Sequence, residues 1–565
     1  MSVCSAAMAR WLVLIALTLT LTPALGADRA GAAYGGAPMR CGGDCDRDRT
    51  VVVNELVTGV NIVLGSAAVD QCPAFDCNAD GTVTVACLVQ GVNSALDGCP
   101  SSVANPTVEG PISGGLGAPF IAATAFDLAE VGYAEAEYFM AGTAAAHISD
   151  EPLGEDGVWT AAPGETAAYK TRVLVYRPID PQQFNGTVIV EWLNVSGGLD
   201  AAADWIMGHT ELTREGYVWV GVSAQFAGVE GGGSVIGLPS MPLKMVDPAR
   251  YAALAHPGDS FSYDIFSQAA QAIWFPGQTN LLGGLKPKAV IAAGESQSAF
   301  RMVTYVNAIH PLADIYDGFL IHSRSSGSTP LSEPPQPAIA APRFVHIRGD
   351  LNVPVLNFQT ESDVTVFASF GSRQADTDRF RLWETAGTAH ADTYTVAVGR
   401  TDRGDSPAVA DLVVTDTPLE GVTCASPINS GPQHFILKAA IAALNRWVRE
   451  GTLPPSAARL DVDPGPPLAI RHDDHGNALA GIRTPQVDVP IARFSGAPQV
   501  GPAICALFGS TAPFDEATLA ALYPTHDAYV AAFNDATDQA VEAGFILAPD
   551  AELMKASAAQ SDVGT

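Results

Sequence analysis

Short runs of apolar residues, rich in β-branched and aromatic side chains, recur along the chain after residue 108. They occupy 172–176, 187–192, 217–222, 289–293, 317–321, 353–358 and 379–383. Nearly continuous apolar runs of this length are typical of strands that are buried on both faces, as in a parallel sheet. The stretches 201–215, 298–310 and 433–450 lie between or after these runs and read as helices; in the last, apolar residues recur every three or four positions. This alternation predicts an α/β fold with helices on both faces of a mostly parallel sheet.

The first residues have a different pattern. Arg10 precedes an apolar run from Trp11 to Leu17, Pro23 interrupts it, and small residues surround Gly26. A basic start, a short apolar stretch and a small-residue exit are typical of a secretory signal peptide. We therefore expect a signal peptide at 1–26, a linker at 27–40 and a secreted or periplasmic protein. No later run approaches the ~18 apolar residues that a membrane span needs, so no span is expected.

Charge narrows the set of partners. The 565 residues include 60 acidic and 30 basic side chains, which gives a formal net charge of −30. Binding to a nucleic-acid backbone requires clustered Lys and Arg to displace counterions, so this class of partner is excluded. The expected partner is instead a small-molecule or polymer substrate.

The cysteines indicate disulfide bonds. Nine are present, and removing Cys4 with the signal peptide leaves eight. Six of these fall between Cys41 and Cys99, as in small exported modules whose core is too small to hold them together. Cys424 and Cys505 stand apart from the others and can pair with each other. The sequence alone does not assign the remaining pairs.

The acidic segment 44–61 is repeated at 76–93, within a cysteine-rich region that we place at 41–100. Oxygen-bearing side chains at positions 1, 3 and 5 of a twelve-residue loop, with a carboxylate at position 12, suit calcium. The first loop offers Asp44, Asp46, Asp48 and Glu55, with the carbonyl of Thr50. The second loop offers Asp76, Asn78 and Asp80, with the carbonyl of Thr82.

The two loops resemble the duplicated calcium-loop segments of dockerin-like modules and other EF-hand relatives. The resemblance implies a small helical module, structural Ca²⁺ and a protein docking partner. The sequence departs from the pattern at Arg49, where Gly is usual, and at Cys87, which replaces the last carboxylate of the second loop. Calcium is therefore expected in the first loop rather than the second. The alternative is a disulfide-held module that binds no metal.

The candidate nucleophile follows the apolar run 289–293. Gly294, Ser296 and Ser298 occupy the pattern Gly-x-Ser-x-small, and a helical segment comes next. A strand, a sharp turn with serine at its apex and a helix together form a nucleophile elbow, in which the flanking residues must be small. Ser298 stands where glycine is usual. We predict Ser296 as the nucleophile.

A serine hydroxyl needs a base, and the usual order along such a chain is serine, acid and histidine. His390 follows the run 379–383 on a loop of small residues, which makes it the candidate base. Asp363 follows the run 353–358 and is the preferred acid, with Glu361 as the alternative. The acid would hold the tautomer of the imidazole.

An acyl-transfer site also needs donors for the oxyanion. The backbone amide of Gln297, directly after the nucleophile, is one candidate. The second donor is expected from the loop 192–198, where Asn194 is the chosen residue and Gly197 and Gly198 permit unusual backbone geometry.

Five segments resemble the α/β-hydrolase superfamily, and more narrowly the bacterial proteins described only as α/β hydrolase domain. They are EWLNVSGG at 191–198, HPGDSFSYDIFSQ at 256–268, GESQS at 294–298, WETAGTAH at 383–390 and GNALAGIRTP at 476–485. The resemblance covers about residues 105–560, within a domain that we place at 101–565. It implies a serine hydrolase of carboxylic esters that uses no metal and no organic cofactor in catalysis.

The predicted hydrolase domain contains two insertions, and its machinery also allows other functions. The segment 227–262 and the long segment 391–565 exceed what the fold needs, so we expect them to form a lid or cap. The same machinery also serves amidases and acyltransferases. A further alternative is an inactive hydrolase domain carried by a calcium-dependent docking module.

Overall fold

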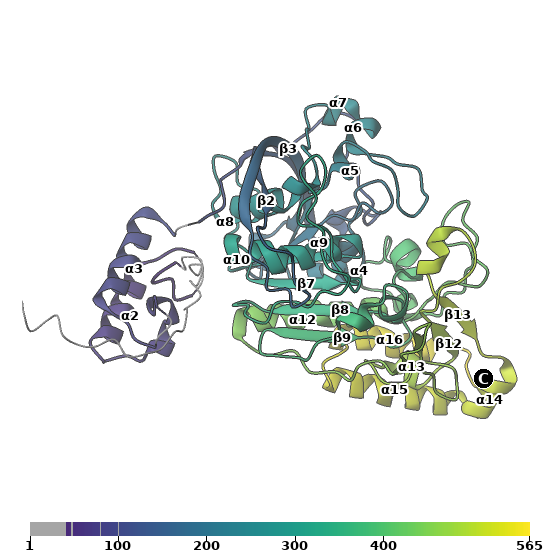
Figure 1. Ribbon diagram of the computed structural model, residues 1–565. Coiled ribbons are helices and arrows are strands. Elements are labelled where there is room, and N and C mark those ends of the chain that lie inside the picture. Colours follow the sequence, from purple (N-terminus) through teal and green to yellow (C-terminus); the bar gives the residue numbers. More distant parts are fainter. Residues whose placement is uncertain (1–40, 47–48, 79–80, 100) are drawn as a thin grey trace, which may run out of the picture. The chain divides into compact units, whose positions relative to one another are not determined.

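The computed structural model describes residues 41–46, 49–78, 81–99 and 101–565 (Figure 1). The expected signal peptide and linker, and the candidate calcium ligands Asp48 and Asp80, lie outside the described residues. Within the described part of the chain, no helix has both the length and the apolar character needed to cross a lipid bilayer.

The cysteine-rich region forms two helices, α2 (Val53–Val63) and α3 (Val85–Asp97), with short 3₁₀ turns at Val69–Gln71 and Pro73–Phe75. Three disulfides hold it, between Cys41 and Cys99, Cys45 and Cys72, and Cys77 and Cys87. The ring of Phe75 fills the centre, where Gly59 allows close approach because a Cβ there would lie 2.5 Å from the ring. With so small an apolar core, the covalent links supply much of the constraint.

The rest of the chain is built on one nine-stranded sheet. Its strands are β1 (Thr107–Glu109), β2 (Tyr133–Ile148), β3 (Ala162–Pro178), β4 (Thr187–Trp192), β5 (Val218–Val222), β6 (Ala289–Glu295), β7 (Gly318–His322), β8 (Val355–Gln359) and β9 (Phe380–Glu384). They are arranged in the order β1-β2-β3-β5-β4-β6-β7-β8-β9. The strands β4 to β9 run parallel, whereas β1, β2 and β3 extend the sheet in antiparallel fashion.

The longer helices of this domain are α4 (Ala203–Arg214), α8 (Ser262–Trp274), α9 (Gln297–Thr304), α12 (Gln433–Glu450), α15 (His526–Glu542) and α16 (Ala548–Gln560). The shorter helices are α5 (Phe226–Val229), α6 (Leu243–Val246), α7 (Pro248–Tyr251), α10 (His310–Ala313), α11 (Glu361–Thr365), α13 (Pro485–Asp488) and α14 (Glu516–Leu522). Two small antiparallel pairs, β10 (Val462–Asp463) with β11 (Ala469–Ile470) and β12 (Ala492–Ser495) with β13 (Ser510–Pro513), lie in the C-terminal part.

Helices cover both faces of the large sheet, which confirms the predicted fold class (Figure 1). In β6, Val290 and Ala292 pack into one apolar core, and Ile291 and Ala293 pack into the other. This alternation is what a sheet buried on both sides requires. The first core includes α8 and α9, and the second includes α4, α12, α15 and α16.

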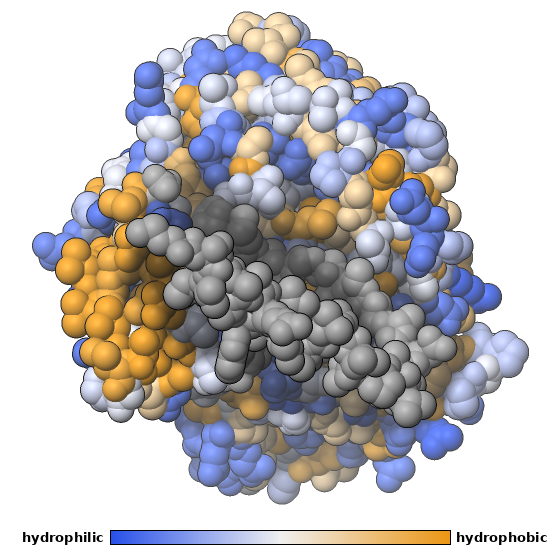
Figure 2. All heavy atoms as spheres, turned by 60° about the vertical axis from the view of Figure 1, so that its left-hand side comes forward, coloured by the Kyte–Doolittle hydropathy of each residue, from blue (hydrophilic) through white to orange (hydrophobic). Residues whose placement is uncertain are grey.

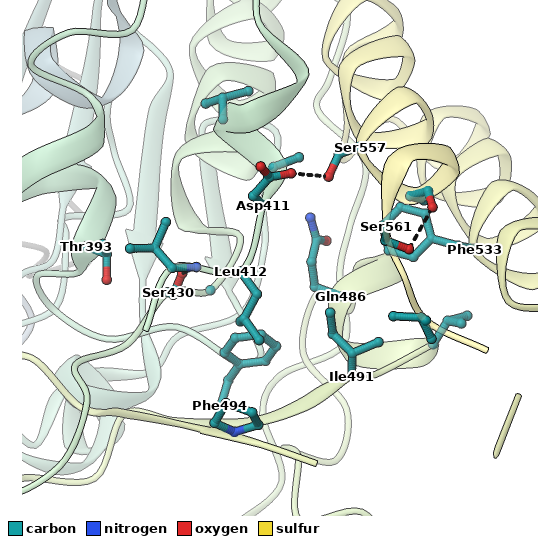
Figure 3. A pocket seen from close by; sticks show the side chains of 18 of the residues that line it. Thr393, Asp411, Leu412, Ser430, Gln486, Ile491, Phe494, Phe533, Ser557 and Ser561 are labelled. Carbon is teal, nitrogen blue, oxygen red and sulfur yellow. Dashed lines mark hydrogen bonds between the residues drawn. The ribbon is translucent and has the colours of Figure 1, made fainter. Parts of the chain in front are cut away.

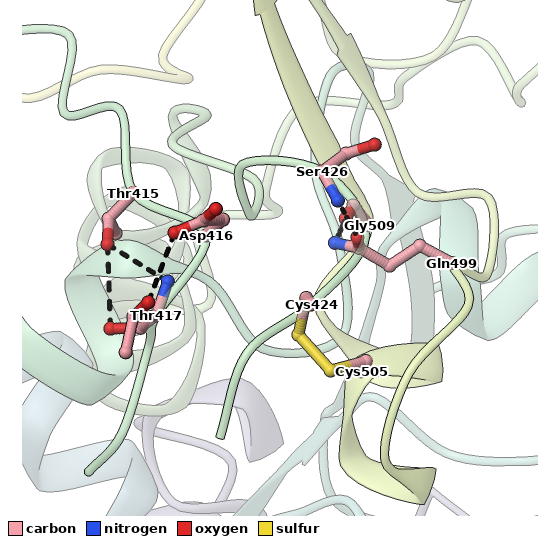
Figure 4. The surroundings of a disulfide bond; sticks show 8 residues. All are labelled: Thr415, Asp416, Thr417, Cys424, Ser426, Gln499, Cys505 and Gly509. Atoms are coloured by element: carbon pink, nitrogen blue, oxygen red, sulfur yellow. Dashed lines mark hydrogen bonds between the residues drawn. A yellow bond between two sulfur atoms is a disulfide. The ribbon is translucent and has the colours of Figure 1, made fainter. Parts of the chain in front are cut away.

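A fourth disulfide joins Cys424 to Cys505, as the sequence indicated (Figure 4). It links two loops that also share backbone and side-chain hydrogen bonds, including that from the Ser426 N–H to Gln499 Oε1 at 2.8 Å. Nearby, the Ala391 N–H donates to the Leu507 carbonyl at 3.2 Å. The disulfide therefore braces the segment that packs beside the loop carrying His390.

Candidate active site

The turn after β6 has the geometry of a nucleophile elbow. Ser296 stands between β6 and α9 with φ 56° and ψ −121°, a positive-φ conformation that is strained for a residue with a Cβ. A Cβ at Gly294 would lie 3.1 Å from the backbone of Ser298, so the position before the turn must be small. The Ser296 N–H donates to the carbonyl of His322 at the end of β7, which anchors the turn to the next strand.

The imidazole of His390 lies between Ser296 and Asp363. His390 Nε2 is 2.7 Å from Ser296 Oγ, and His390 Nδ1 is 2.6 Å from Asp363 Oδ1. With the ring proton on Nδ1, donated to Asp363, the other nitrogen is left to accept a proton from serine. Ser296 keeps 9% of its surface exposed, whereas the Asp363 side chain is fully buried.

The two candidate acids have different neighbours. Asp363 Oδ2 accepts hydrogen bonds from the Thr360 N–H, the Thr360 hydroxyl and the Ser323 hydroxyl, at 2.7 to 2.8 Å. Glu361 accepts instead from the N–H groups of Gly387 and Gly496, at 2.6 and 2.8 Å. Glu361 therefore supports the backbone of the histidine loop, and Asp363 is the carboxylate that contacts the imidazole.

Comparison with known families agrees with this architecture. The family model described as "Alpha/beta hydrolase domain" matches residues 108–556. The chain belongs to this family.

Solved structures with partial similarity to this α/β hydrolase domain include several esterases. A fungal esterase of Rhizomucor miehei is 12% identical, with 55% of this chain and 86% of that chain covered and a TM-score of 0.24. The esterase Est22 is 13% identical over 46% and 75%, with a TM-score of 0.24, and Thermogutta terrifontis esterase 2 is 13% identical over 38% and 78%, with a TM-score of 0.22. No curated protein matches the chain.

The loop predicted to supply the oxyanion donor lies against the elbow of the α/β hydrolase domain. Asn194 Nδ2 donates to the Glu295 carbonyl at 3.1 Å and to Glu295 Oε2 at 2.9 Å, and the Asn194 N–H donates to the Ala201 carbonyl. Among the residues that the structure describes, the N–H of the next residue, Val195, has no hydrogen-bond acceptor. Gln297 is the first residue of α9, where an N–H has no partner within the helix.

Glu295 is a third carboxylate beside Ser296 and His390, and it was not predicted from the sequence. Its Oε1 atom lies 3.5 Å from His390 Nε2, and the residue is 9% exposed. Burial raises the pKa of Glu295 to about 7, opposed by the nearby imidazoles of His390 and His322. Burial alone would lower the pKa of His390, but Asp363 and Glu295 hold it above its ordinary value.

A second buried histidine lies behind the elbow and was also missed. His322 Nδ1 is 2.8 Å from Asp204 Oδ1 in α4, and His322 Nε2 is 3.1 Å from the Gln433 amide nitrogen in α12. Burial alone would lower the pKa of His322, but Asp204 holds it above its ordinary value. Both Glu295 and His322 end parallel strands, and polar residues at the carboxyl ends of such strands are the signal that could have found them.

The insertion at 227–262 covers the loop 194–198. The Ser234 hydroxyl and the Val235 N–H both donate to the Ser196 carbonyl at 3.0 Å, and the Met241 N–H donates to the Gly198 carbonyl at 2.8 Å. A Cβ at Gly198 would lie 2.9 Å from the backbone of Ser240, so the two segments are in direct contact. This placement is that of a lid over the candidate oxyanion loop.

The two acidic loops of the N-terminal module have the same turn. Asp44 Oδ2 accepts from the Arg49 N–H at 2.9 Å, and Asp76 Oδ2 accepts from the Gly81 N–H at 2.8 Å. Arg49 has φ 59° and Gly81 has φ 80°, so arginine adopts the conformation for which glycine is usual.

Of the predicted calcium ligands within the described residues, the structure groups those of the first loop. Asp44, Asp46 and Glu55 each offer an oxygen atom within 4.8 Å of the others. Glu55 also accepts hydrogen bonds from the N–H groups of Cys45 and Val52, at 2.6 and 2.9 Å, which turn its carboxylate toward the loop. The donors of the first loop are hard oxygens, which fit Ca²⁺.

The second loop differs at its last position. Cys87 is engaged in a disulfide with Cys77 and offers no carboxylate. Among the described residues, Asp76 does not belong to a group of three His, Cys, Asp or Glu side chains. The contrast between the loops therefore lies in the carboxylate that Glu55 supplies to the first.

Proposed function

We propose that this α/β hydrolase is an exported serine hydrolase of carboxylic esters. The single observation that carries the proposal is the continuous arrangement of Ser296 Oγ, His390 and Asp363, with donor–acceptor distances of 2.7 and 2.6 Å at a strained elbow. A serine held this way has a base to accept its proton and an acid to fix the base. The disulfides favour an oxidising compartment, as the proposed export requires.

In the proposed reaction, Ser296 Oγ attacks the ester carbonyl while His390 Nε2 takes the serine proton. The imidazolium then gives this proton to the departing alkoxide, which leaves an acyl-enzyme. Water, deprotonated by His390, attacks the acyl carbon, and the proton passes back to Ser296 as the acid is released. Asp363 stays ionised and stabilises the imidazolium throughout.

Negative charge on the carbonyl oxygen requires backbone donors near Ser296. The N–H of Gln297 is one proposed donor. Asn194 stays a prediction as the second: its own N–H and side chain already donate to Ala201 and Glu295. The N–H groups of Val195 and Gly197 in this loop lack an acceptor among the described residues, and either can serve as the second donor.

The nucleophile is tested by labelling the mature protein with a fluorophosphonate probe. Labelling is expected in the parent and in Ser298→Ala, and lost in Ser296→Ala. Ser298 is a matched control because it lies two positions away, fully buried, and its hydroxyl has no hydrogen-bond partner among the described residues. Labelling that follows Ser298 would contradict the proposal, and absence of both labelling and short-chain ester turnover would reject an active hydrolase.

The lid is proposed to set substrate specificity. Its contacts with Ser196 and Gly198 place it over the candidate oxyanion loop. Replacing 231–244 by a short glycine-rich linker is expected to change the relative kcat/KM values across an ester series that varies in acyl length. An unchanged series, at retained activity, would show that specificity resides elsewhere.

For the N-terminal module we propose a second role, binding of a protein partner through an apolar face. Eight exposed apolar side chains occupy equivalent positions of the two repeats, on or next to α2 and α3, and the molecular surface shows a cluster of apolar side chains (Figure 2). They are Val53, Val57, Val60 and Leu64 with Val85, Val89, Val92 and Leu96. Exposed apolar patches of this kind mark interaction surfaces.

Docking is tested by using the full-length protein as bait for exported proteins of its source. Leu64→Lys with Leu96→Lys is expected to abolish capture, because both side chains are more than 70% exposed and their replacement disturbs no core. The control is a pair of lysines at Asn61 and Asn93, which are exposed repeat equivalents. If both double-lysine variants captured the partner equally well, the apolar face would not be the docking surface.

A further inference from the structure

The segment 391–565, which follows His390, encloses a cavity of about 630 Å³ (Figure 3). Its walls come from the turn Tyr394–Val398, the loop 409–413, the first turn of α12, the segment 486–494 and the ends of α15 and α16. Ser296, Gln297 and His390 are not among its described lining residues. The cavity is therefore separate from the catalytic centre, and its volume lies in the range of small-molecule sites.

The walls have no positive charge. Aromatic rings supply much of the lining, and the described lining residues include neither Lys nor Arg. The carboxylates present are Asp411 and Asp562. Hydroxyl and amide groups complete the wall, at Thr393, Ser430, Gln486, Ser557, Gln560 and Ser561. An anionic ligand would meet carboxylates without a compensating cation, whereas an uncharged ring system with hydrogen-bonding groups finds both kinds of contact.

Two polar side chains at the cavity lack partners within the described chain. The Gln486 side chain points into the cavity, and its Oε1 atom has no donor (Figure 3). His434 is 3% exposed, its ring stacks on Tyr394, and neither ring nitrogen has a partner. Burial lowers the pKa of His434 well below its ordinary value, so the ring is neutral and offers one donor and one acceptor. Buried polar atoms without a partner in the protein are satisfied by a bound molecule such as a ligand or water.

We propose that this cavity is a second binding site, for an uncharged aromatic or alicyclic molecule that carries hydroxyl groups. The rings of Phe494 and Phe533 flank the apolar part, and Gln486 supplies an acceptor for a ligand hydroxyl. The proposal stands independently of the ester hydrolysis proposed above, because it uses none of the catalytic residues.

The probes are three naphthalene derivatives that differ in charge. Calorimetric titration of the full-length Ser296→Ala protein at pH 7 with neutral 2-naphthol is expected to give one site. Anionic 2-naphthoate is expected to bind at least tenfold more weakly, because the described walls offer carboxylates and neither Lys nor Arg. Equal or tighter binding of 2-naphthoate, or tighter binding of cationic 2-naphthylmethylammonium, would overturn the assigned ligand class.

Two variants locate the site. Gln486→Leu keeps the side-chain volume and is expected to weaken 2-naphthol binding at least tenfold without lowering Tm, because it removes a buried oxygen that lacks a donor. Leu412→Trp, at a half-buried loop position on the wall, is expected to abolish binding by filling the cavity. Gln539→Leu, on the exposed side of α15, is the control and leaves the affinity unchanged.

Two outcomes reject the cavity as the site. One is unchanged 2-naphthol affinity in both Gln486→Leu and Leu412→Trp. The other is loss of 2-naphthol binding when Ser296 of the parent carries a fluorophosphonate adduct, since this would place the probe in the catalytic centre.

Discussion

At the scale of single residues, the charges around Ser296 decide the chemistry. Asp363 and Glu361 leave the same strand end, two positions apart, yet one contacts the imidazole and the other contacts backbone N–H groups. Glu295 adds a third carboxylate on the serine side of the ring. Each carboxylate has a separate consequence that a single substitution can show.

Asp363→Asn is expected to lower kcat by about 10³–10⁴-fold, because an amide cannot stabilise the imidazolium and favours the wrong tautomer. Glu361→Gln leaves the contact between Asp363 and the imidazole in place, so it is expected to lower kcat by less than about tenfold. It should instead cost about 1–3 kcal/mol of stability, since one buried N–H loses its acceptor. Steady-state kinetics and thermal melts of both variants check the pair. The reverse ranking in kcat would make Glu361 the acid.

Glu295 shapes the pH dependence. The proposed reaction needs neutral His390. Asp363 and Glu295 raise the pKa of this imidazole, so activity should fall at a higher pH than for an ordinary histidine as the solution is acidified. Glu295→Gln removes one negative charge 3.5 Å from Nε2, so the acid limb of kcat/KM should move to lower pH. The charged groups facing Glu295 are His390, His322, Asp204 and Asp363, which are unchanged in the variant. An acid limb that stays in place, or moves up, would show that Glu295 is not ionised in the active form.

The same carboxyl links to stability in a defined direction. Its pKa in the folded protein, about 7, lies above the ordinary value, so the folded state holds this proton more tightly. Ionisation therefore destabilises the fold as pH rises from about 4.5 to 7. Tm of Glu295→Gln is expected to exceed that of the parent at pH 8, and the difference in Tm is expected to disappear near pH 4. A difference in Tm that does not change with pH would contradict the raised pKa of Glu295.

At the scale of elements, the apolar runs located the seven strands from β3 to β9, because strands buried on both faces carry their own signal. The long strand β2 was not predicted. Its sequence mixes Ala, Glu and Gly, which do not favour strands, and it is extended because β3 pairs with it over most of its length. Ser296 and His390 were predicted from their places after strands, and they lie within hydrogen-bond distance of each other. The sequence favoured Asp363 and left Glu361 as the alternative, since both follow β8 and only the direction of the side chain distinguishes them.

The disulfide between Cys424 and Cys505 braces the segments beside the histidine loop. It closes a loop across a sequence separation of 81 residues, for which chain entropy alone gives a stabilisation of about 4 kcal/mol. The double variant Cys424→Ala with Cys505→Ala is expected to have a much lower Tm. Its activity is also expected to be lower at temperatures where it is still folded. Tm of the chemically reduced parent is measured for comparison, because reduction also opens the three disulfides of the N-terminal module. If the double variant melts like the parent, the contacts from Ser426 and Ala391 suffice without the covalent link.

At the scale of the whole molecule, a net charge of −30 favours cations wherever oxygens converge, and the first acidic loop is such a place. Calorimetric titration of the metal-free full-length protein with Ca²⁺ is expected to show one site. Asp44→Asn should abolish it, because it removes a charged ligand at the first loop position. Asp76→Asn should leave it intact, because Cys87 deprives the second loop of its last carboxylate. Two equivalent sites, or none, would correct this assignment.

The first turn of α12 connects two regions described separately above. Gln433 contacts His322, whose carbonyl anchors Ser296, and the next residue, His434, lines the large cavity. Gln433 and His434 are adjacent residues of one helical turn, so the wall of the cavity and the support of Ser296 belong to the same structural element. Binding at two sites is thermodynamically reciprocal. If a molecule bound in the cavity changes the affinity of Ser296 for an ester analogue by some factor, the bound ester analogue changes the affinity of the cavity for that molecule by the same factor. Measuring the coupling from either side must give the same number.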